Sequence, residues 1–124
     1  ENCWGLTACD TYNGYDAYSP TNDGGTIAPT AALSAFPYTP EFSMKALKHF
    51  YFDLGDNIWS EYGFVDAFNE SKNWYAGSHL AIDQGPIVAM IENYRSQLIW
   101  NLLTGCPEIK NGMKNILGFT APYL

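Results

Sequence analysis

The longest hydrophobic pattern in the chain runs over residues 80–103, with the sequence LAIDQGPIVAMIENYRSQLIWNLL. Apolar residues recur there at helical spacing and also fill the other faces, so the pattern predicts one long helix that is buried on most sides. Asp83 stands where an N-cap is expected, and Pro86 follows in the expected first turn, where amide groups have no partner within the helix. Glu92 and Arg95, three residues apart, are expected to form an ion pair.

Three shorter helices are predicted from prolines at their starts and glycines at their ends. They cover residues 26–36, 41–54 and 107–117, with Pro29, Pro40 and Pro107 near their starts and Gly55 and Gly118 after two of their ends. The intervening residues 4–23 and 56–81 carry turn dipeptides and many aromatic side chains, so long irregular loops are expected there.

The two halves of the chain share a pattern of short motifs. Residues 23–25 precede the first helix and residues 83–85 open the long one, while the Pro-Glu pairs at residues 40–41 and 107–108 start the helix that follows each. A chance similarity of proline and glycine motifs is the alternative, but we interpret the pattern as a repeat. It predicts an all-α array of stacked helical hairpins. Two hairpins leave the inner helices poorly covered, so we expect the chain to be a piece of something larger or to assemble with a partner.

The composition is that of a globular chain with a large core. Of 124 residues, 47% are hydrophobic and 15% are charged, which excludes a disordered protein and fits a single domain. The formal net charge of −7 argues against nucleic acid or an anionic membrane surface as a partner. No apolar run reaches membrane-spanning length, and we expect no signal peptide within the sequence as it begins at Glu1.

The cysteines predict neither a disulfide framework nor a metal site. Cys3, Cys9 and Cys106 are odd in number and lack metal-binding or redox spacing. A bridge between Cys3 and Cys9 is conceivable, but buried free thiols are the favoured interpretation. The chain also lacks a glycine-rich phosphate loop and a nucleophilic serine elbow. A carboxylate metal site stays open, although it has no characteristic spacing here, and the prediction is that the chain has no metal and no cofactor.

Aspartates gather in the predicted loops that precede the helices. In an antiparallel array these loops lie at one end, where their carboxylates could line a common acidic mouth. Glycoside hydrolysis uses such paired carboxylates, one protonated and one ionised. For each aspartate alone, a helix cap or an Asx-turn is the alternative. The residues expected at the mouth are Asp16, Asp23, Asp66 and Asp83.

Aromatic residues make up 16% of the chain, and many stand beside glycine, asparagine or aspartate in the predicted loops. Single loop aromatics most often pack as lids. In this number they suggest a surface that stacks on flat faces, either of sugar rings or of a protein partner. His79, in the loop before the long helix, could bind sugar hydroxyls or satisfy its own loop, and we favour the second.

Six blocks of sequence carry a resemblance to a known family. They are WGLTACD, DTYNGYDAY, DGGTIAPTAALSAFPYTPE, YGFVDAFN, IDQGPIVAMIENYRS and a closing segment that begins PEI. In this order they resemble blocks of the bacterial glycoamylase-type family, and together they span essentially the whole chain. Members of that family are often labelled putative glucoamylases. It includes endo-β-1,2-glucanases and the C-terminal portions of cyclic β-1,2-glucan synthases.

The resemblance implies an (α/α)6 toroid, with twelve helices in two concentric rings and a glycan cleft at one end. This chain would be the C-terminal part, about four helices, of one catalytic domain, and the missing N-terminal part would be its partner. The resemblance also implies an inverting glycoside hydrolase, acting on a glucan that is β-1,2-linked, with a periplasmic or secreted location. The expected site comprises the acids Asp83, Asp66 and Asp23 and the substrate-binding candidates Tyr15, Tyr18, Trp74, Tyr75, His79, Gln84 and Glu92.

In that scheme Asp83 would be the general base that acts on water, and the general acid would lie upstream of this chain. The chain alone would then be inert. Two other functions stay open: a non-catalytic glycan-binding module, in which Asp83 is only a helix cap, and a helical protein-interaction module. Nothing in these residues specifies α over β linkage, and analogy of fold does not settle the substrate.

Overall fold

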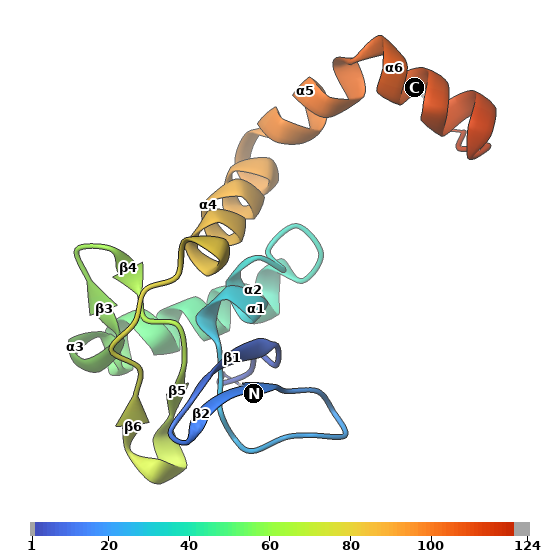
Figure 1. The fold of residues 1–124 in the computed structure, drawn as a ribbon. Helices are drawn as coiled ribbons and strands as arrows, with labels where there is room; N and C mark the ends of the chain where they lie inside the picture. Colours follow the sequence, from blue (N-terminus) through green and yellow to red (C-terminus); the bar gives the residue numbers. More distant parts are fainter. Residues whose placement is uncertain (1, 121–124) are drawn as a thin grey trace. The chain divides into compact units, whose positions relative to one another are not determined.

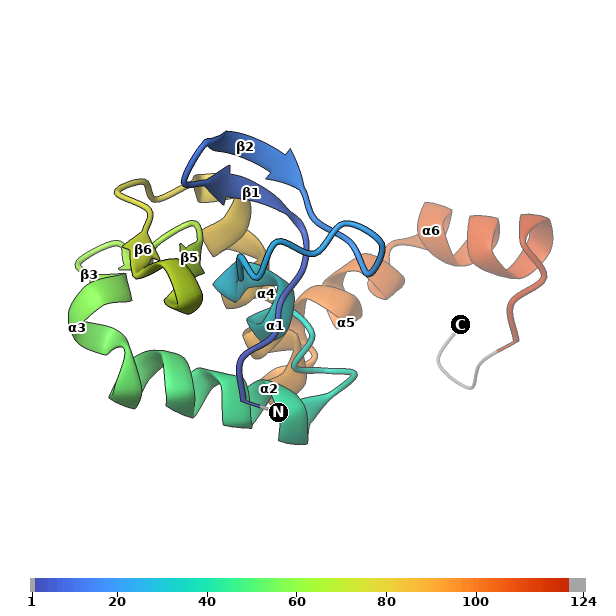
Figure 2. The same cartoon turned by 90° about the horizontal axis from the view of Figure 1, so that it is seen from below.

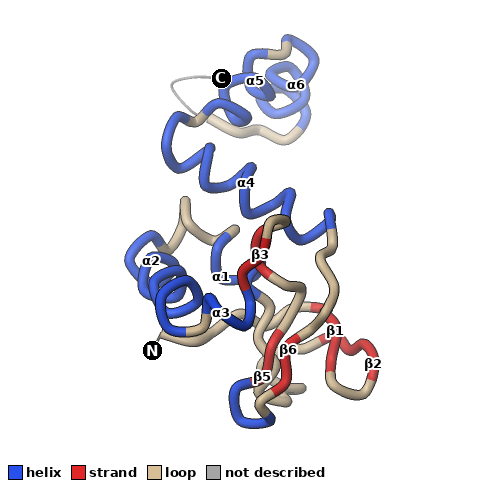
Figure 3. The backbone as a smooth tube through the Cα atoms, turned by 90° about the vertical axis from the view of Figure 1, so that its left-hand side faces the viewer, coloured by secondary structure: helices blue, strands red, loops and turns tan. Residues whose placement is uncertain are grey.

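The structure is a computed structural model that describes residues 2–120. The chain divides into two compact units, Glu1–Ile91 and Glu92–Leu124. The described strands all lie in the first unit, together with helices α1 to α3 (Figures 1 and 3). Helix α4, Ala81–Ser96, crosses the boundary between the units. None of the helices in the described part is both long and apolar enough to cross a membrane.

The first unit contains three antiparallel hairpins, which the all-α prediction missed. They are β1 (Ala8–Thr11) with β2 (Gly14–Ala17), β3 (Trp59–Ser60) with β4 (Gly63–Phe64), and β5 (Phe68–Asn69) with β6 (Trp74–Tyr75). A 3-10 turn, η2 (Glu70–Lys72), joins the last pair. Strands of two to four residues are too short to show the alternation by which a strand is recognised. The segments predicted as irregular loops therefore carry hairpins.

The helices of the first unit begin near the predicted prolines. They are α1 (Pro29–Leu33), α2 (Pro40–Lys48), the π-helical turn η1 (His49–Asp53) and α3 (Gly55–Ile58). Helix α1 starts later than predicted because Ile27 is held in a β-bridge, in which the backbones of Ile27 and Phe68 exchange hydrogen bonds of 2.8 and 2.9 Å. The prediction that Gly55 ends a helix is wrong in part. The preceding turn η1 does end just before it, at Asp53 with Leu54 as its C-cap, but Gly55 starts the next helix, α3.

Helices α1 and α2 lie side by side in the first unit, packed through small side chains (Figure 2). Ala32 and Ala46 are fully buried in the hydrophobic core. Ser43 is also buried, and its Oγ donates a 2.8 Å hydrogen bond to the backbone oxygen of Ala32. The hydroxyl is thus satisfied without a bulky partner, so the two backbones can approach closely.

Phe50, in the π-helical turn η1, is the centre of the aromatic core. Its ring contacts Phe68 edge-on at a centroid distance of 5.4 Å and Phe64 at 6.1 Å. Leu33 and Ile58 are buried in the same cluster. The core thereby joins α1, the end of α2 and two of the hairpins, and Ile87 adds the start of α4 to it.

Helix α4 begins at Ala81, so two details of the predicted long helix are wrong. Asp83 lies within the first turn instead of capping it, and Pro86 lies inside the helix, beyond the turn where its missing amide would cost nothing. The backbone oxygen of Leu80 accepts hydrogen bonds from the amides of Asp83 and Gln84, both at 3.0 Å. The carboxylate of Asp83 still lies near the N-terminus of the helix, as predicted.

The second unit contains the end of α4, then α5 (Leu98–Gly105), α6 (Pro107–Asn111) and the π-helical turn η3 (Gly112–Ile116). The single helix predicted over residues 80–103 is therefore broken. Gln97 has a left-handed backbone with φ of 58°, and the Oδ1 atom of Asn93 accepts hydrogen bonds from the amides of Ile99 and Trp100 at 3.0 and 3.1 Å. The Asn93 side chain thus satisfies the second and third amides of α5, and Oγ of Ser96 accepts a hydrogen bond from the first, that of Leu98, so the new helix starts there.

The prediction that this helical region is buried on most sides does not hold within this chain. Its exposed apolar residues are Ile82, Val88, Tyr94, Leu98, Ile99, Leu102 and Leu103. The pair predicted between Glu92 and Arg95 is confirmed, with Oε2 and Nη1 3.4 Å apart.

Replacing Phe50 with alanine should lower the free energy of unfolding by about 3–5 kcal/mol, because a buried aromatic side chain is lost and the core relaxes only partly. Phe52→Ala is the matched control two residues away, since its ring is 75% exposed, and its effect should stay within about 0.5 kcal/mol. Urea unfolding followed by circular dichroism measures both. Equal losses in the two variants would contradict this description of the core.

Candidate active site

Asp66 is a carboxylate inside the core of the first unit. It lies two residues before β5, between the buried residues Val65 and Ala67, and is only 1% exposed. Its Oδ2 atom accepts a 2.7 Å hydrogen bond from the amide of Asp10, and its own amide donates to the backbone oxygen of Ser78 at 2.9 Å. Its Oδ1 atom is buried and accepts no hydrogen bond from any donor in residues 2–120. A buried oxygen without a donor is costly, so this atom requires a proton or a ligand nearby.

Asp83 supplies the carboxyl that interacts with Asp66. The pKa of Asp83 is raised from 3.8 to about 7. The largest cause is burial, followed by the hydrogen-bonding interaction with Asp66 and then by the negative charges of Asp66 and Asp10. A protonated Asp83 can donate a hydrogen bond to the carboxylate of Asp66, and this interaction adds to the effect of burial on the pKa of Asp83.

Asp10 and Ser78 complete the surroundings of the pair. The hydroxyl of Ser78 donates to Oδ2 of Asp10, whose backbone amide in turn donates to Asp66. Cys9 is buried next to them, and burial together with the charges of Asp66, Asp10 and Asp83 raises the pKa of its thiol to about 12. The thiol therefore stays protonated and acts as a small apolar neighbour of the acids, not as a nucleophile.

The backbone at the start of α4 is held at several points. Thr30, in α1, donates its hydroxyl to the backbone oxygen of Asp83 at 2.9 Å. The side-chain amide of Gln84 donates to the backbone oxygen of Phe64 at 2.6 Å. Gly63 has φ of 92°, and a side chain there would place its Cβ 2.7 Å from Oε1 of Gln84. These contacts fix the position from which Asp83 reaches Asp66.

The structure brings Asp66 and Asp83 together but leaves the other predicted acids, Asp16 and Asp23, exposed. Asp23 is exposed, and its Oδ1 accepts a 2.8 Å hydrogen bond from the amide of Gly25, which is an Asx-turn. Asp16 is also exposed and accepts hydrogen bonds from the amide of Ala17 and the side chain of Asn22. Within residues 2–120 neither is among the groups that shift the pKa of Asp83. The catalytic role of Asp23, Asp66 and Asp83 stays a prediction.

The predicted sugar-binding aromatics differ in exposure. Tyr15, in strand β2 opposite Asp10, is 67% exposed, whereas Trp74 and Tyr75 are partly buried and pack against the core. Tyr18 is also partly buried, and its hydroxyl lies 3.4 Å from Oγ1 of Thr26. Of these four rings, Tyr15 presents the most free surface.

The polar substrate-binding candidates all have partners within the protein. His79 shares a 2.8 Å hydrogen bond between its Nε2 and Oγ of Ser60, which supports the interpretation that it satisfies its own loop. Gln84 bonds to Phe64 as described above. Glu92 lies in the second unit, where it pairs with Arg95 and accepts a hydrogen bond from Ser96. Their roles toward a substrate stay predictions.

Sequence analysis missed Asp10 and Ser78 as members of this site. Asp10 belongs to β1, which was taken for a loop, and nothing in its spacing links it to Asp66, 56 residues away. Ser78 carries no motif at all. These contacts depend on the hairpins, and they were missed because the sequence pattern did not predict the hairpins.

The sequence model of a family described as putative glucoamylase, named Glycoamylase, matches residues 1–107. The chain belongs to this glycoamylase family. It is similar to a solved protein from Bacteroides uniformis described as a putative glucoamylase, with 59% identity and a TM-score of 0.95 over 99% of this chain and 30% of that one. An endo-β-1,2-glucanase from Chitinophaga pinensis, solved with sophorotriose and glucose, shows 54% identity and a TM-score of 0.92 over the same shares.

A curated relative of this glycoamylase-family chain is also named as a glucan hydrolase. It is an exo β-1,2-glucooligosaccharide sophorohydrolase (non-reducing end) of Parabacteroides distasonis, 48% identical over 118 residues. The match covers 94% of the present chain but 16% of that relative. The chain thus spans less than a third of the length of each of these three relatives.

Stability should depend on pH through Asp83. Its folded pKa of about 7 lies above the unfolded value of 3.8, so the folded state holds more protons between these values. The stabilising contribution of Asp83 to the free energy of unfolding is fully present below pH 3.8 and is lost as the pH rises through 7. Asp83→Asn should therefore flatten the fall in unfolding free energy over this range, measured by urea unfolding at several pH values. The exposed Asp56→Asn should leave the slope as it is, and an unchanged slope in Asp83→Asn would contradict the assignment.

Proposed function

We propose that this chain is the C-terminal part of the (α/α)6 catalytic domain of a glycoside hydrolase that cleaves β-1,2-linked glucan by an inverting mechanism. The observation that carries the proposal is the carboxyl pair of Asp66 and Asp83, with the pKa of Asp83 raised to about 7. A carboxyl that titrates near the operating pH suits acid–base catalysis, because both its forms are populated. The β-1,2 linkage is supported by the names of the Chitinophaga pinensis and Parabacteroides distasonis relatives.

The closeness of Asp66 and Asp83 defines their roles in this proposal. In an inverting hydrolase the acid and the base stand roughly 6.5–9.5 Å apart, so that a water molecule and the sugar fit between them. Two carboxyls that interact by hydrogen bonding are too close to be such a pair. Asp83 is therefore the general base that activates water, and Asp66 is the positioning residue that orients Asp83 and raises its pKa.

The general acid then lies outside this chain, in the N-terminal part of the same domain. The exposed apolar residues of α4 and α5 support the same conclusion, since a ring of helices would cover them. The missing part of the domain is thus the partner of this chain, and a glucan is its substrate. A periplasmic or secreted location stays a prediction.

The catalytic test uses the full-length protein that contains this chain. Asp83→Asn should lower reducing-sugar release from linear β-1,2-glucan by roughly a thousandfold or more, because the group that takes the proton from water is lost. Binding of the glucan, measured by calorimetry, should be retained. Asp56→Asn is the control, an exposed aspartate within the same unit, and should keep full activity.

The outcomes separate the possible functions. Unchanged turnover in Asp83→Asn would overturn the role of Asp83 and direct the search to Asp23 and Asp66. Binding without turnover in the unmodified protein would show a glycan-binding module. Neither binding nor turnover with any glucan would favour a protein-interaction module.

The isolated 124-residue chain should release no reducing sugar from the same substrate, because it lacks the general acid. The measurement is the same assay, run over a long incubation, with the full-length protein as the positive control. Circular dichroism of the isolated chain shows whether its helices are present. Any hydrolysis that Asp83→Asn abolishes in the isolated chain would contradict the placement of the general acid upstream.

A further inference from the structure

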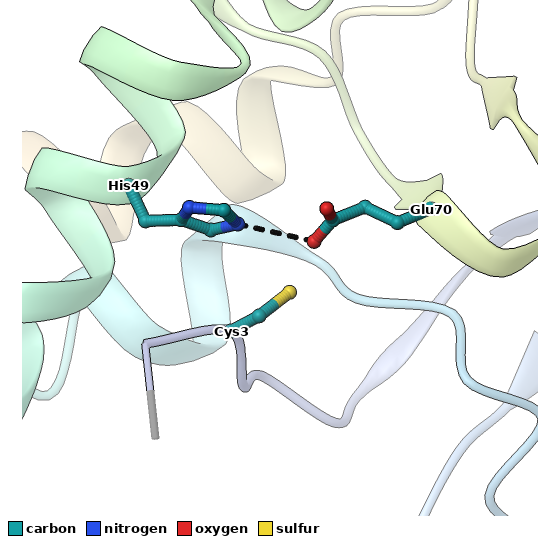
Figure 4. A group of neighbouring side chains, drawn as sticks. All are labelled: Cys3, His49 and Glu70. Carbon is teal, nitrogen blue, oxygen red and sulfur yellow. Dashed lines mark hydrogen bonds and ion pairs between the residues drawn. The ribbon is translucent and has the colours of Figure 1, made fainter.

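Three potential metal ligands meet in the first unit, away from the Asp66–Asp83 pair. Cys3 comes from the segment before β1, His49 from the first position of η1, and Glu70 from the first position of η2. Figure 4 shows the three side chains converging from these separate segments. One ligand atom from each, a sulfur, a ring nitrogen and a carboxylate oxygen, lies within 4.8 Å of the other two.

His49 is oriented as metal-binding histidines usually are. Its Nδ1 is 2.8 Å from Oδ2 of Asp53, and its Nε2 is 3.1 Å from Oε1 of Glu70. A carboxylate on the far nitrogen fixes the ring and makes it a stronger ligand, and this arrangement is common around zinc. Asp53 therefore has the place of a supporting residue, and Nε2 is the atom presented to Glu70 and Cys3.

A metal ion at this cluster would compete with protons for its ligand atoms. Burial alone would lower the pKa of His49, but the hydrogen bonds to Glu70 and Asp53 outweigh it and the pKa is raised. Burial raises the pKa of Cys3 to about 12, and the hydrogen bond to Glu70 adds to the effect. A divalent cation would replace two protons, the one on the Cys3 thiol and the one on Nε2 of His49, and both would go to solvent.

The ligand chemistry selects among cations. Zinc binds thiolate sulfur, imidazole nitrogen and carboxylate oxygen together, commonly in tetrahedral geometry. Calcium and magnesium prefer oxygen ligands and do not use a cysteine or a histidine. Three protein ligands leave a fourth zinc position for water.

We propose that Cys3, His49 and Glu70 bind one Zn2+ ion, supported by Asp53, and that the ion fastens the segment before β1 to the turns η1 and η2. The three ligands are far apart in sequence, so a zinc ion here would close two long loops of chain. Binding to the folded state alone would stabilise it by mass action. This site is independent of the proposed hydrolase chemistry, because none of its residues contacts Asp66 or Asp83 through a hydrogen bond in the described part of the chain.

The test is zinc binding by the full-length protein after dialysis against a chelator. ZnCl2 is added alone, and bound zinc is measured by competition with a chromogenic chelator. The unmodified protein should hold one zinc equivalent that Cys3→Ala loses. Cys106→Ala is the matched control, because Cys106 also donates to a glutamate, Glu108, at 2.9 Å but has no histidine in its cluster. Asp53→Asn should weaken zinc affinity by about 10–100-fold without changing the stoichiometry.

A cobalt experiment gives a readout that identifies the thiolate ligand directly. Co2+ added in place of zinc should produce a thiolate-to-cobalt charge-transfer band in the unmodified protein and in Cys106→Ala, but not in Cys3→Ala. Circular dichroism melts confirm that each variant is folded. The proposal is overturned if the unmodified protein takes up no zinc in competition with the chelator, or if Cys3→Ala retains the same zinc equivalent and the same cobalt band as Cys106→Ala.

Discussion

The buried carboxylate of Asp66 is the constraint around which the first unit is organised. Ionised groups are costly in a protein interior unless hydrogen bonds or opposite charges compensate them, and no lysine or arginine is hydrogen-bonded to this one among the described residues. The compensation comes from the amide of Asp10 and from the hydrogen-bonding interaction with the carboxyl of Asp83. The interactions of a single side chain, that of Asp66, therefore connect strand β1, the β5 hairpin and the start of α4.

The packing of the core around Asp66 accounts for the raised pKa of Asp83. The core places Asp66 where it can be neither solvated nor paired with a cation, and burial with that charge nearby raises the pKa of Asp83. A less buried site would leave two ordinary carboxylates, both ionised at neutral pH. The contacts of Thr30 and Gln84 hold the first turn of α4, so the separation of the two carboxyls does not depend on their own attraction.

The sequence pattern predicted the helix starts, which the chemistry of proline and glycine controls. It missed the contacts that depend on pairing between residues far apart in the chain. Pro29 and Pro40 lie in the first turns of α1 and α2 as expected, because the missing amide of proline is harmless only there. The break at Gln97 was missed, since a non-glycine residue with a left-handed backbone leaves no signal in the sequence, and the cap comes from Asn93, six and seven residues before the amides it satisfies. Asp66 and Asp83 could be selected by their local surroundings, whereas Asp10 reaches them only through a hairpin pairing that no local pattern shows.

The thiol of Cys9 can serve as a chemical probe of local opening at this site. The Cys9 thiol is 1% exposed and has a pKa of about 12. In the closed structure an alkylating reagent cannot reach it and the reactive thiolate is not formed, so it reacts only when the surrounding structure opens. Its rate of labelling in the native protein thus measures the free energy of local opening around the carboxyls, in the same way as amide hydrogen exchange. Any ligand that fills the space beside Asp66 and Asp83 would slow that labelling, whether or not it is ever hydrolysed.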